Sequence, residues 1–306
     1  MYESFHGLTR KPFSLLPDPA FLYLGKRHQM AFSLLQYGIQ EGYGFVVVTG
    51  EIGAGKTTLL QSFLKQVRDD VRTGLITHTH ATYGDVIRSV ASAFDLTCTG
   101  DSQLVYNGFR DFLRSCDAAG KRALLIVDEA QNLSVEALEE LRMLSNLNTG
   151  SRVLLQIVLS GQPQLLDHLR RPDLQQFVQR IGISYHLKAL ELPETMAYIR
   201  HRVQVAGGDP LLFDDMACTA AHLYAGGIPR LVNVLCDLAL VYAYAEDRRR
   251  IDFDTIVDVA EARSQGGLSG FHGDAAGKSR EQLRTLSWRE LSGAAARPAA
   301  DARQQA

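Results

Sequence analysis

The feature that most constrains the fold of this sequence is the segment Gly50-Glu-Ile-Gly-Ala-Gly-Lys-Thr57. It has the G-x-x-x-x-G-K-[ST] spacing of a P-loop, and it lies between an apolar run and a helical pattern, as a P-loop requires. The glycines let backbone N–H groups approach a phosphate chain, Lys56 adds a positive charge, and the Thr57 hydroxyl can bind Mg²⁺. We therefore predict that ATP and Mg²⁺ bind here, with nucleotide contacts from Gly50, Glu51, Ile52, Gly53, Ala54, Gly55, Lys56, Thr57 and Thr58.

Apolar runs alternate with helical patterns through the first part of the chain. The runs lack polar alternation, which is typical of strands buried on both faces of a sheet. They lie at 45–49, 75–80, 123–127 and 153–159. Because strand, helix and strand repeat in this order, we expect a parallel sheet with right-handed crossovers. The prediction is an αβα P-loop NTPase domain of the α/β class over residues 1–190.

The pattern changes near residue 190. Residues 194–263 show helical patterns only, so we expect a small helical lid domain over 191–265. Residues 266–306 are rich in Gly, Ala and Ser, which favours a flexible, disordered tail. The alternative is a short docking helix in this tail, because Ser279 and Gln282 have capping-box spacing and Trp288 could anchor such a helix to a partner.

Two acids, Asp128 and Glu129, follow the apolar run at 123–127. A buried strand that ends in two carboxylates is the Walker B pattern, in which the first acid holds Mg²⁺ and the second polarises the attacking water. We predict these roles for the two residues. At the end of the next predicted strand, Gln162 or its rival Ser160 would point into the same crevice, where it could contact the γ-phosphate or the water.

Two arginines are weaker candidates from the residues alone. Arg180 follows a helical pattern and Arg230 begins another one. A guanidinium offers fixed donors to phosphate oxygens, but most arginines lie on the surface without such a role.

Taken in order, these motifs resemble the AAA+ ATPases, in particular the general secretion pathway A-type family, which includes pilus- and exosortase-associated ATPases. The resemblance covers residues 1–263. It is carried by Met1-Tyr-Glu-Ser-Phe-His-Gly-Leu8, Lys11-Pro-Phe13, Pro17-Asp-Pro19, Tyr37-Gly38, Gly44-Phe45, Val127-Asp-Glu-Ala-Gln131, Gly161-Gln-Pro163, Gln179-Arg-Ile181 and Gly227-Ile-Pro-Arg-Leu-Val-Asn233.

The resemblance implies roles for the two arginines. Arg180 falls where such proteins carry an arginine finger that reaches the ATP of a neighbouring subunit, and Arg230 falls at the sensor-2 position of the lid. It therefore also implies a homo-oligomer, either a ring or a filament. Many relatives continue into a membrane span and a periplasmic wall-binding domain. Neither pattern is found in this sequence, so we do not extend peptidoglycan binding to this chain.

Charge and cysteine usage limit the remaining classes. The formal net charge of −2 argues against strong attraction of the whole molecule to nucleic acid. The sequence lacks a signal-peptide pattern and its apolar runs are too short to cross a bilayer, so we expect a cytoplasmic protein, recruited to the inner membrane by a partner. The cysteines show no C-x-x-C spacing, and His78 and His80 lack a third ligand, so we predict no transition-metal site.

Three functions are compatible with these observations. The leading hypothesis is an ATP-hydrolysing motor or switch that acts on a protein assembly for secretion, pilus formation or exopolysaccharide export. The second is an ATP-dependent DNA-binding regulator of the transposition type, which the near-neutral charge weakens. The third, a small-molecule P-loop kinase, is disfavoured by Glu129 and by the helical domain.

Overall fold

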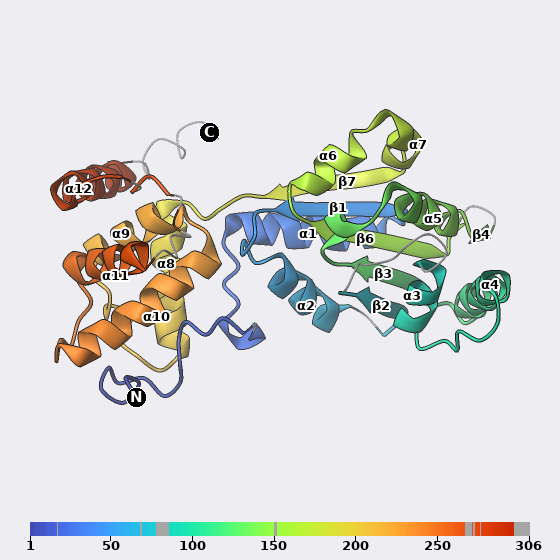
Figure 1. Ribbon diagram of the computed structural model, residues 1–306. Coiled ribbons are helices and arrows are strands. Elements are labelled where there is room, and N and C mark those ends of the chain that lie inside the picture. The colour runs from blue at the N-terminus through green and yellow to red at the C-terminus, as the bar shows by residue number, and fades with distance from the viewer. Residues whose placement is uncertain are drawn as a thin grey trace, which may run out of the picture. The chain divides into compact units, whose positions relative to one another are not determined.

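The computed structural model describes residues 1–16, 18–67, 69–77, 86–149, 152–266, 271, 273–275 and 277–296 (Figure 1). The chain forms two compact units. The sheet unit comprises Lys26–Ile52 and Lys56–Leu187. The helical unit comprises Met1–Gly25, Gly53–Gly55 and Lys188–Ala306.

Five parallel strands form the main sheet of the sheet unit, in the order β2-β3-β6-β1-β7. Their bounds are Phe45–Gly50 for β1, Val71–Ile76 for β2, Arg122–Val127 for β3, Leu155–Gly161 for β6 and Ile181–Leu187 for β7. A short antiparallel pair, β4 (Asn148–Thr149) and β5 (Arg152–Val153), precedes β6 along the chain. Since β6 lies between β1 and β3, the residues that follow these three strands meet at one edge of the sheet.

Helices pack on both faces of this sheet. Phe45 and Val47 of β1 belong to a buried cluster with residues of α3 to α7. Val46 points instead to α1, because a Cβ added to Gly38 of that helix would lie 2.7 Å from Cγ2 of Val46. This alternation along the strand gives the αβα layering that the sequence predicted. The helices are α1 (Lys26–Gln40), α2 (Lys56–Gln66), α3 (Val86–Ala93), α4 (Ser102–Ala118), α5 (Val135–Ser145), α6 (Gln164–Leu169) and α7 (Gln175–Val178), with 3-10 turns η2 (Ala130–Asn132) and η3 (Pro172–Leu174).

The strand predictions need two corrections. The predicted strand at 75–80 overlaps β2 only at its end, because β2 occupies Val71–Ile76, and residues 78–85 lie outside the described part of the chain. The sequence analysis also missed β7. This edge strand buries Leu187, whereas Gly182 and Ser184 are exposed to solvent. It therefore lacks the continuous apolar run of an inner strand.

The helical unit is built from α8 (Leu192–Val205), α9 (Asp215–Ala225), α10 (Pro229–Ala245), α11 (Phe253–Gln265) and α12 (Arg280–Ala296), with the 3-10 turn η1 at Pro19–Phe21. Asp214 and Asp252 cap α9 and α11 by accepting hydrogen bonds from main-chain N–H groups. Pro229 occupies the first turn of α10, where its missing N–H has no cost. These capping residues determine where the three helices begin.

The N-terminal segment belongs to the helical unit and not to the sheet unit. Tyr2, Leu8, Phe13 and Phe21 are buried in the core that α8 to α11 form. In Figure 1 this segment, in dark blue, runs beside α10. The predicted boundary near residue 190 lies close to Lys188, but the assignment of residues 1–25 to the α/β domain was wrong, because their apolar side chains pack on helices distant in the sequence.

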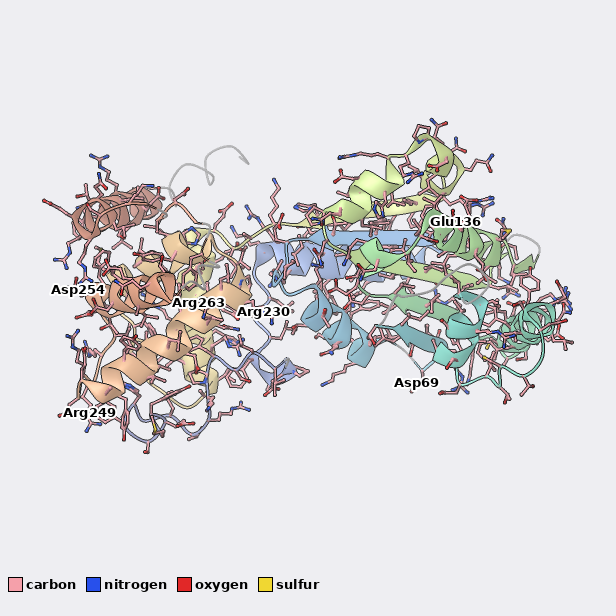
Figure 2. All side chains as sticks on the ribbon, in the orientation of Figure 1. Asp69, Glu136, Arg230, Arg249, Asp254 and Arg263 are labelled. Carbon is pink, nitrogen blue, oxygen red and sulfur yellow. The ribbon has the colours of Figure 1, made fainter. Side chains whose placement is uncertain are left out.

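The expectation of a structureless tail is wrong for residues 280–296, which form α12. Leu283 of α12 is buried in the core of the helical unit, while Trp288 remains 64% exposed. Arg284 donates to both carboxylate oxygens of Asp254, which is labelled in Figure 2, at 2.8 and 2.7 Å. Arg280 pairs with Asp258 of the same helix, α11. A helix therefore forms in this region, as the alternative predicted, and its contacts here are with its own chain, while docking on a partner stays a prediction.

Within the described ranges, no helix combines the length and the apolar character that a bilayer crossing needs.

Candidate functional site

The predicted P-loop connects β1 to α2. β1 ends at Gly50 and α2 begins at Lys56, so the segment joins a buried strand to a helix N-terminus. Gly53 and Gly55 have φ angles of 81° and 97°, in the left-handed region that favours glycine. Ala54 is buried, whereas Glu51 and Ile52 are exposed. Left-handed glycines directly before a helix N-terminus are typical of a loop that binds an anion through its backbone N–H groups.

Lys56 is buried with only 6% of its surface exposed. Its Nζ donates to the main-chain oxygens of Gly50 at 2.7 Å and Glu51 at 3.0 Å. Burial lowers the pKa of Lys56, while the carboxylates of Glu129 and Asp128 act in the opposite direction. The amine thus lies inside the loop, and both predicted Walker B acids act on its charge.

Asp128 joins the P-loop helix to the centre of the sheet. Its Oδ2 accepts a hydrogen bond from the Thr57 hydroxyl at 2.7 Å, and its Oδ1 accepts one from the Ser160 hydroxyl at 2.8 Å. Asp128 is 4% exposed. The two residues predicted to bind Mg²⁺, Thr57 and Asp128, are therefore in direct contact, although 71 positions separate them in the sequence.

Glu129 follows directly and adopts a left-handed conformation with φ of 53°. Its Oε2 accepts hydrogen bonds from Nε2 of Gln162 at 3.2 Å and from Nε2 of Gln131 at 2.6 Å. The two candidates at the end of β6 therefore have different partners, since Ser160 contacts Asp128 and Gln162 contacts Glu129. Sequence analysis missed Gln131 as a site residue, although its place two residues after Glu129 was a usable signal.

This donor set fits a magnesium-bound nucleotide. Mg²⁺ takes oxygen ligands and is commonly held by one or two carboxylates together with substrate phosphates. Thr57 and Asp128 supply a hydroxyl and a carboxylate at one point, and Lys56 supplies the charge for phosphate oxygens. Among the residues described, no three His, Cys, Asp or Glu side chains gather into a metal-binding group. The pair His78 and His80 lies outside the described residues.

Comparison with known proteins agrees with this geometry. Residues 39–169 match the family described as an AAA domain. The chain is 43% identical over 253 residues to "General secretion pathway protein A" of Aeromonas hydrophila, an alignment that covers 82% of this chain and 46% of that protein. The chain belongs to the AAA+ ATPases. It spans about half the length of the curated relative that it matches.

Solved structures share the fold of this AAA+ chain. The Aeropyrum pernix ORC2 protein in ADPNP–ADP complexes has a TM-score of 0.62 at 14% identity, covering 92% of this chain and 90% of that one. Drosophila ORC bound to DNA has a TM-score of 0.65 at 15% identity, covering 97% and 78%. The Walker-type ATPase of Pyrococcus abyssi has a TM-score of 0.55 at 18% identity, covering 91% and 81%. At such identities the likeness shows the fold alone.

The two arginines of this AAA+ chain are both exposed. Arg180 is exposed directly before the edge strand β7, and among the described residues no side-chain hydrogen bond joins it to Lys56, Asp128 or Glu129. Arg230 is exposed in the first turn of α10 (Figure 2). Its main-chain N–H donates to the oxygen of Gly53 at 3.2 Å, and both residues belong to the helical unit. The structure thus brings together Lys56, Thr57, Asp128, Glu129, Ser160 and Gln162, and leaves Arg180 out of this group.

The N-terminal segment carries three aromatic residues whose rings are candidates for stacking on adenine: Phe5, Phe13 and Tyr23. Phe13 is buried and packs edge-on against Phe213, with ring centroids 5.6 Å apart. Tyr23 packs against Tyr198 at 6.0 Å, and Phe5 lies beneath the guanidinium of Arg249 at 4.0 Å. Each ring therefore has a packing role within the helical unit.

Proposed function

We propose that this chain binds ATP with Mg²⁺ and hydrolyses it to ADP and phosphate. The observation that carries the proposal is the 2.7 Å hydrogen bond from Thr57 at the start of α2 to Asp128 at the end of β3. It joins the two halves of a P-loop ATPase site in one contact. Lys56 inside the loop and Glu129 beside Asp128 complete the groups that phosphoryl transfer to water needs.

Each side chain has a defined task in this proposal. Lys56 binds the β- and γ-phosphate oxygens, and Thr57 with Asp128 holds the metal, which when bound neutralises charge on those oxygens. Glu129 takes a proton from the attacking water as the water oxygen bonds to the γ-phosphorus and the bond to ADP breaks. Gln162 orients the same water in this proposal, which its hydrogen bond to Glu129 supports.

The test is steady-state ATP turnover by purified protein. Lys56→Ala should lower turnover by about 100-fold or more, since removal of one such electrostatic group costs about 10²–10³ in rate. Lys65→Ala is the matched control, because Lys65 is an exposed lysine on the same helix. Glu129→Gln should retain binding of a fluorescent ATP analogue while turnover is lost. Equal turnover by wild type and Lys56→Ala contradicts the proposal.

We further propose that Arg180 acts on the ATP of a neighbouring copy. Its exposure beside the edge strand β7 supports this, because a residue so placed can reach another subunit. Lys56→Ala and Arg180→Ala proteins should each be inactive, whereas their mixture should regain activity, since an intact loop and an intact arginine then meet at some interfaces. No recovery in oligomers shown to contain both variants excludes action in trans. Arg230, in the first turn of α10, is proposed as the lid residue that senses the nucleotide.

The similarity to General secretion pathway protein A supports a role in a secretion assembly at the inner membrane. In the native host, Lys56→Ala should leave exported proteins inside the cell, while Lys65→Ala should not. A DNA-binding regulator is the alternative outcome. Retention of DNA on a filter at low salt, in the presence of an ATP analogue, together with normal export, would favour it.

A further inference from the structure

Gln131 forms a bridge between Glu129 and the end of β6. Its Nε2 donates to Oε2 of Glu129 at 2.6 Å, and its Oε1 accepts a hydrogen bond from the main-chain N–H of Gln162 at 2.9 Å. The side-chain amide of Gln162 donates to the same Oε2 at 3.2 Å. One carboxylate oxygen is therefore held by two amides, and one of these amides is itself anchored to the backbone.

The orientation of the Gln131 amide follows from its partners. A main-chain N–H can only donate, so the group that faces Gln162 must be the amide oxygen. The amide NH₂ then faces Glu129, whose carboxylate accepts the hydrogen bond. The bridge thus has a fixed direction, from the backbone at the end of β6 through Gln131 to Glu129.

The fit around Gln131 is close. A Cβ added to Gly161 would lie 2.8 Å from Oε1 of Gln131 and 3.3 Å from its main-chain nitrogen. Glycine at this position lets the end of β6 approach the bridge, and a larger residue would displace it.

Glu129 depends on such support because its backbone is strained. A left-handed φ in a residue other than glycine costs about 1–3 kcal/mol and persists only where surrounding contacts determine it. Glu129 is the N-cap residue of η2, but its side chain accepts no capping hydrogen bond there. The amide of Gln131 is a contact that ties its carboxylate to a buried strand.

We propose that Gln131 is a positioning residue for ATP hydrolysis, which holds the carboxylate of Glu129 in the orientation that receives the proton of the attacking water. This inference rests on the proposed ATPase function. The side-chain hydrogen bonds of Gln131 go to Glu129 and Gln162, and not to Lys56, Thr57 or Asp128, which bind the nucleotide and metal in that function. Its loss therefore affects kcat and leaves nucleotide affinity unchanged.

The test replaces the donor of the bridge and keeps its shape. Gln131→Glu retains an oxygen for the N–H of Gln162 but places a second carboxylate against Glu129. The matched control is Asn132→Asp, the same amide-to-acid change at the next position, where the side chain is exposed. Gln131→Leu, which has no donor, serves as a second variant should Gln131→Glu fail to fold.

We expect kcat of Gln131→Glu to fall about 10- to 100-fold at pH 8, since small displacements of a catalytic group cost up to about 10²-fold. The Kd for an ATP analogue should stay within about twofold of wild type. The ratio of mutant to wild-type kcat should rise as the pH falls from 9 to 6, because a protonated carboxyl at position 131 can again donate to Glu129. Lys56, which interacts electrostatically with Glu129, is unchanged in every variant. Gln131→Leu should lose activity at every pH without this rise.

Two results would overturn the inference. One is a kcat for Gln131→Glu and Gln131→Leu within twofold of Asn132→Asp. The other is a parallel loss of nucleotide affinity and kcat with no change in the pH profile, which is the behaviour of a merely structural residue. Both results require an active wild-type protein. An inactive wild type, equal to Lys56→Ala, refutes the ATPase proposal itself and is thereby distinguished from failure of the Gln131 inference.

Discussion

Replacing Arg202 with methionine should lower the free energy of unfolding of the helical unit by about 2–4 kcal/mol. Arg202 lies on α8 and is 7% exposed. Its Nε donates to the oxygen of Pro12 at 2.5 Å, its Nη1 to the hydroxyl oxygen of Tyr198 at 2.9 Å and its Nη2 to the oxygen of Ser14 at 3.4 Å. The guanidinium also lies 4.9 Å from the ring centroid of Phe21. One buried cation thus fastens the N-terminal segment to the helices.

The magnitude follows from these contacts. A hydrogen bond to a charged group contributes about 1.5–3 kcal/mol, so the two shorter bonds give about 3–6 kcal/mol. Methionine preserves much of the apolar stem and removes the cost of burying a charge, which offsets part of that loss. The net expected loss in the free energy of unfolding is therefore about 2–4 kcal/mol. This corresponds to about a factor of 30 to 1,000 in the unfolding equilibrium constant.

Urea unfolding followed by tryptophan fluorescence measures this effect. Trp288 on α12 is the only tryptophan of the chain, so its signal reports on the helical unit. Arg200→Met is the matched control, because Arg200 lies on the same helix and pairs with Asp215 at the surface, where an ion pair contributes about 0–1 kcal/mol. Equal midpoints for Arg202→Met and Arg200→Met would show that the buried cation does not anchor the N-terminal segment.

Two further predictions concern the helical unit. Burial lowers the pKa of His222 below its ordinary value of 6.5, so the unfolded chain takes up a proton that the folded chain resists, and the melting temperature should fall as the pH drops below 6.5. His222→Gln should flatten this slope in a thermal-shift assay, and an unchanged slope contradicts the assignment. Arg280→Met should destabilise the docked α12 by about 1 kcal/mol or less at low salt, because the side chains of Arg280 and Asp258 are partly exposed. Helical content and Trp288 fluorescence during unfolding measure this effect. Salt screens exposed ion pairs, so a stability difference between wild type and Arg280→Met that persists at about 1 M NaCl would show that the ion pair does not cause it.

Local patterns in the sequence were sufficient for the parts of the site that lie on one strand and its following turn. The P-loop could be located because Gly, Lys and Thr are needed at fixed positions along a single turn. The strands β1 and β3 were visible as uninterrupted apolar runs, and Asp128 and Glu129 as the acids that follow one of them. Each of these signals is contained in fewer than about ten consecutive residues, a range in which backbone geometry alone relates sequence to structure.

Contacts between distant segments needed the tertiary structure. The strand order places β6 between β1 and β3, and only this order brings Ser160 to Asp128 and Gln162 to Glu129. The sequence could not choose between Ser160 and Gln162, because both follow the same strand and the choice of partner depends on which way each side chain leaves it.

The sequence by itself determined that this chain has a P-loop, a parallel α/β core and a helical region after it. Only the tertiary structure decided that residues 1–25 pack with the helical unit, that α12 docks on α9 and α11, and that Gln131 holds Glu129. The physical reason is the same in each case. Burial of an apolar side chain or satisfaction of an amide depends on a partner far along the chain, and the free energy of that contact exists only once both segments are folded.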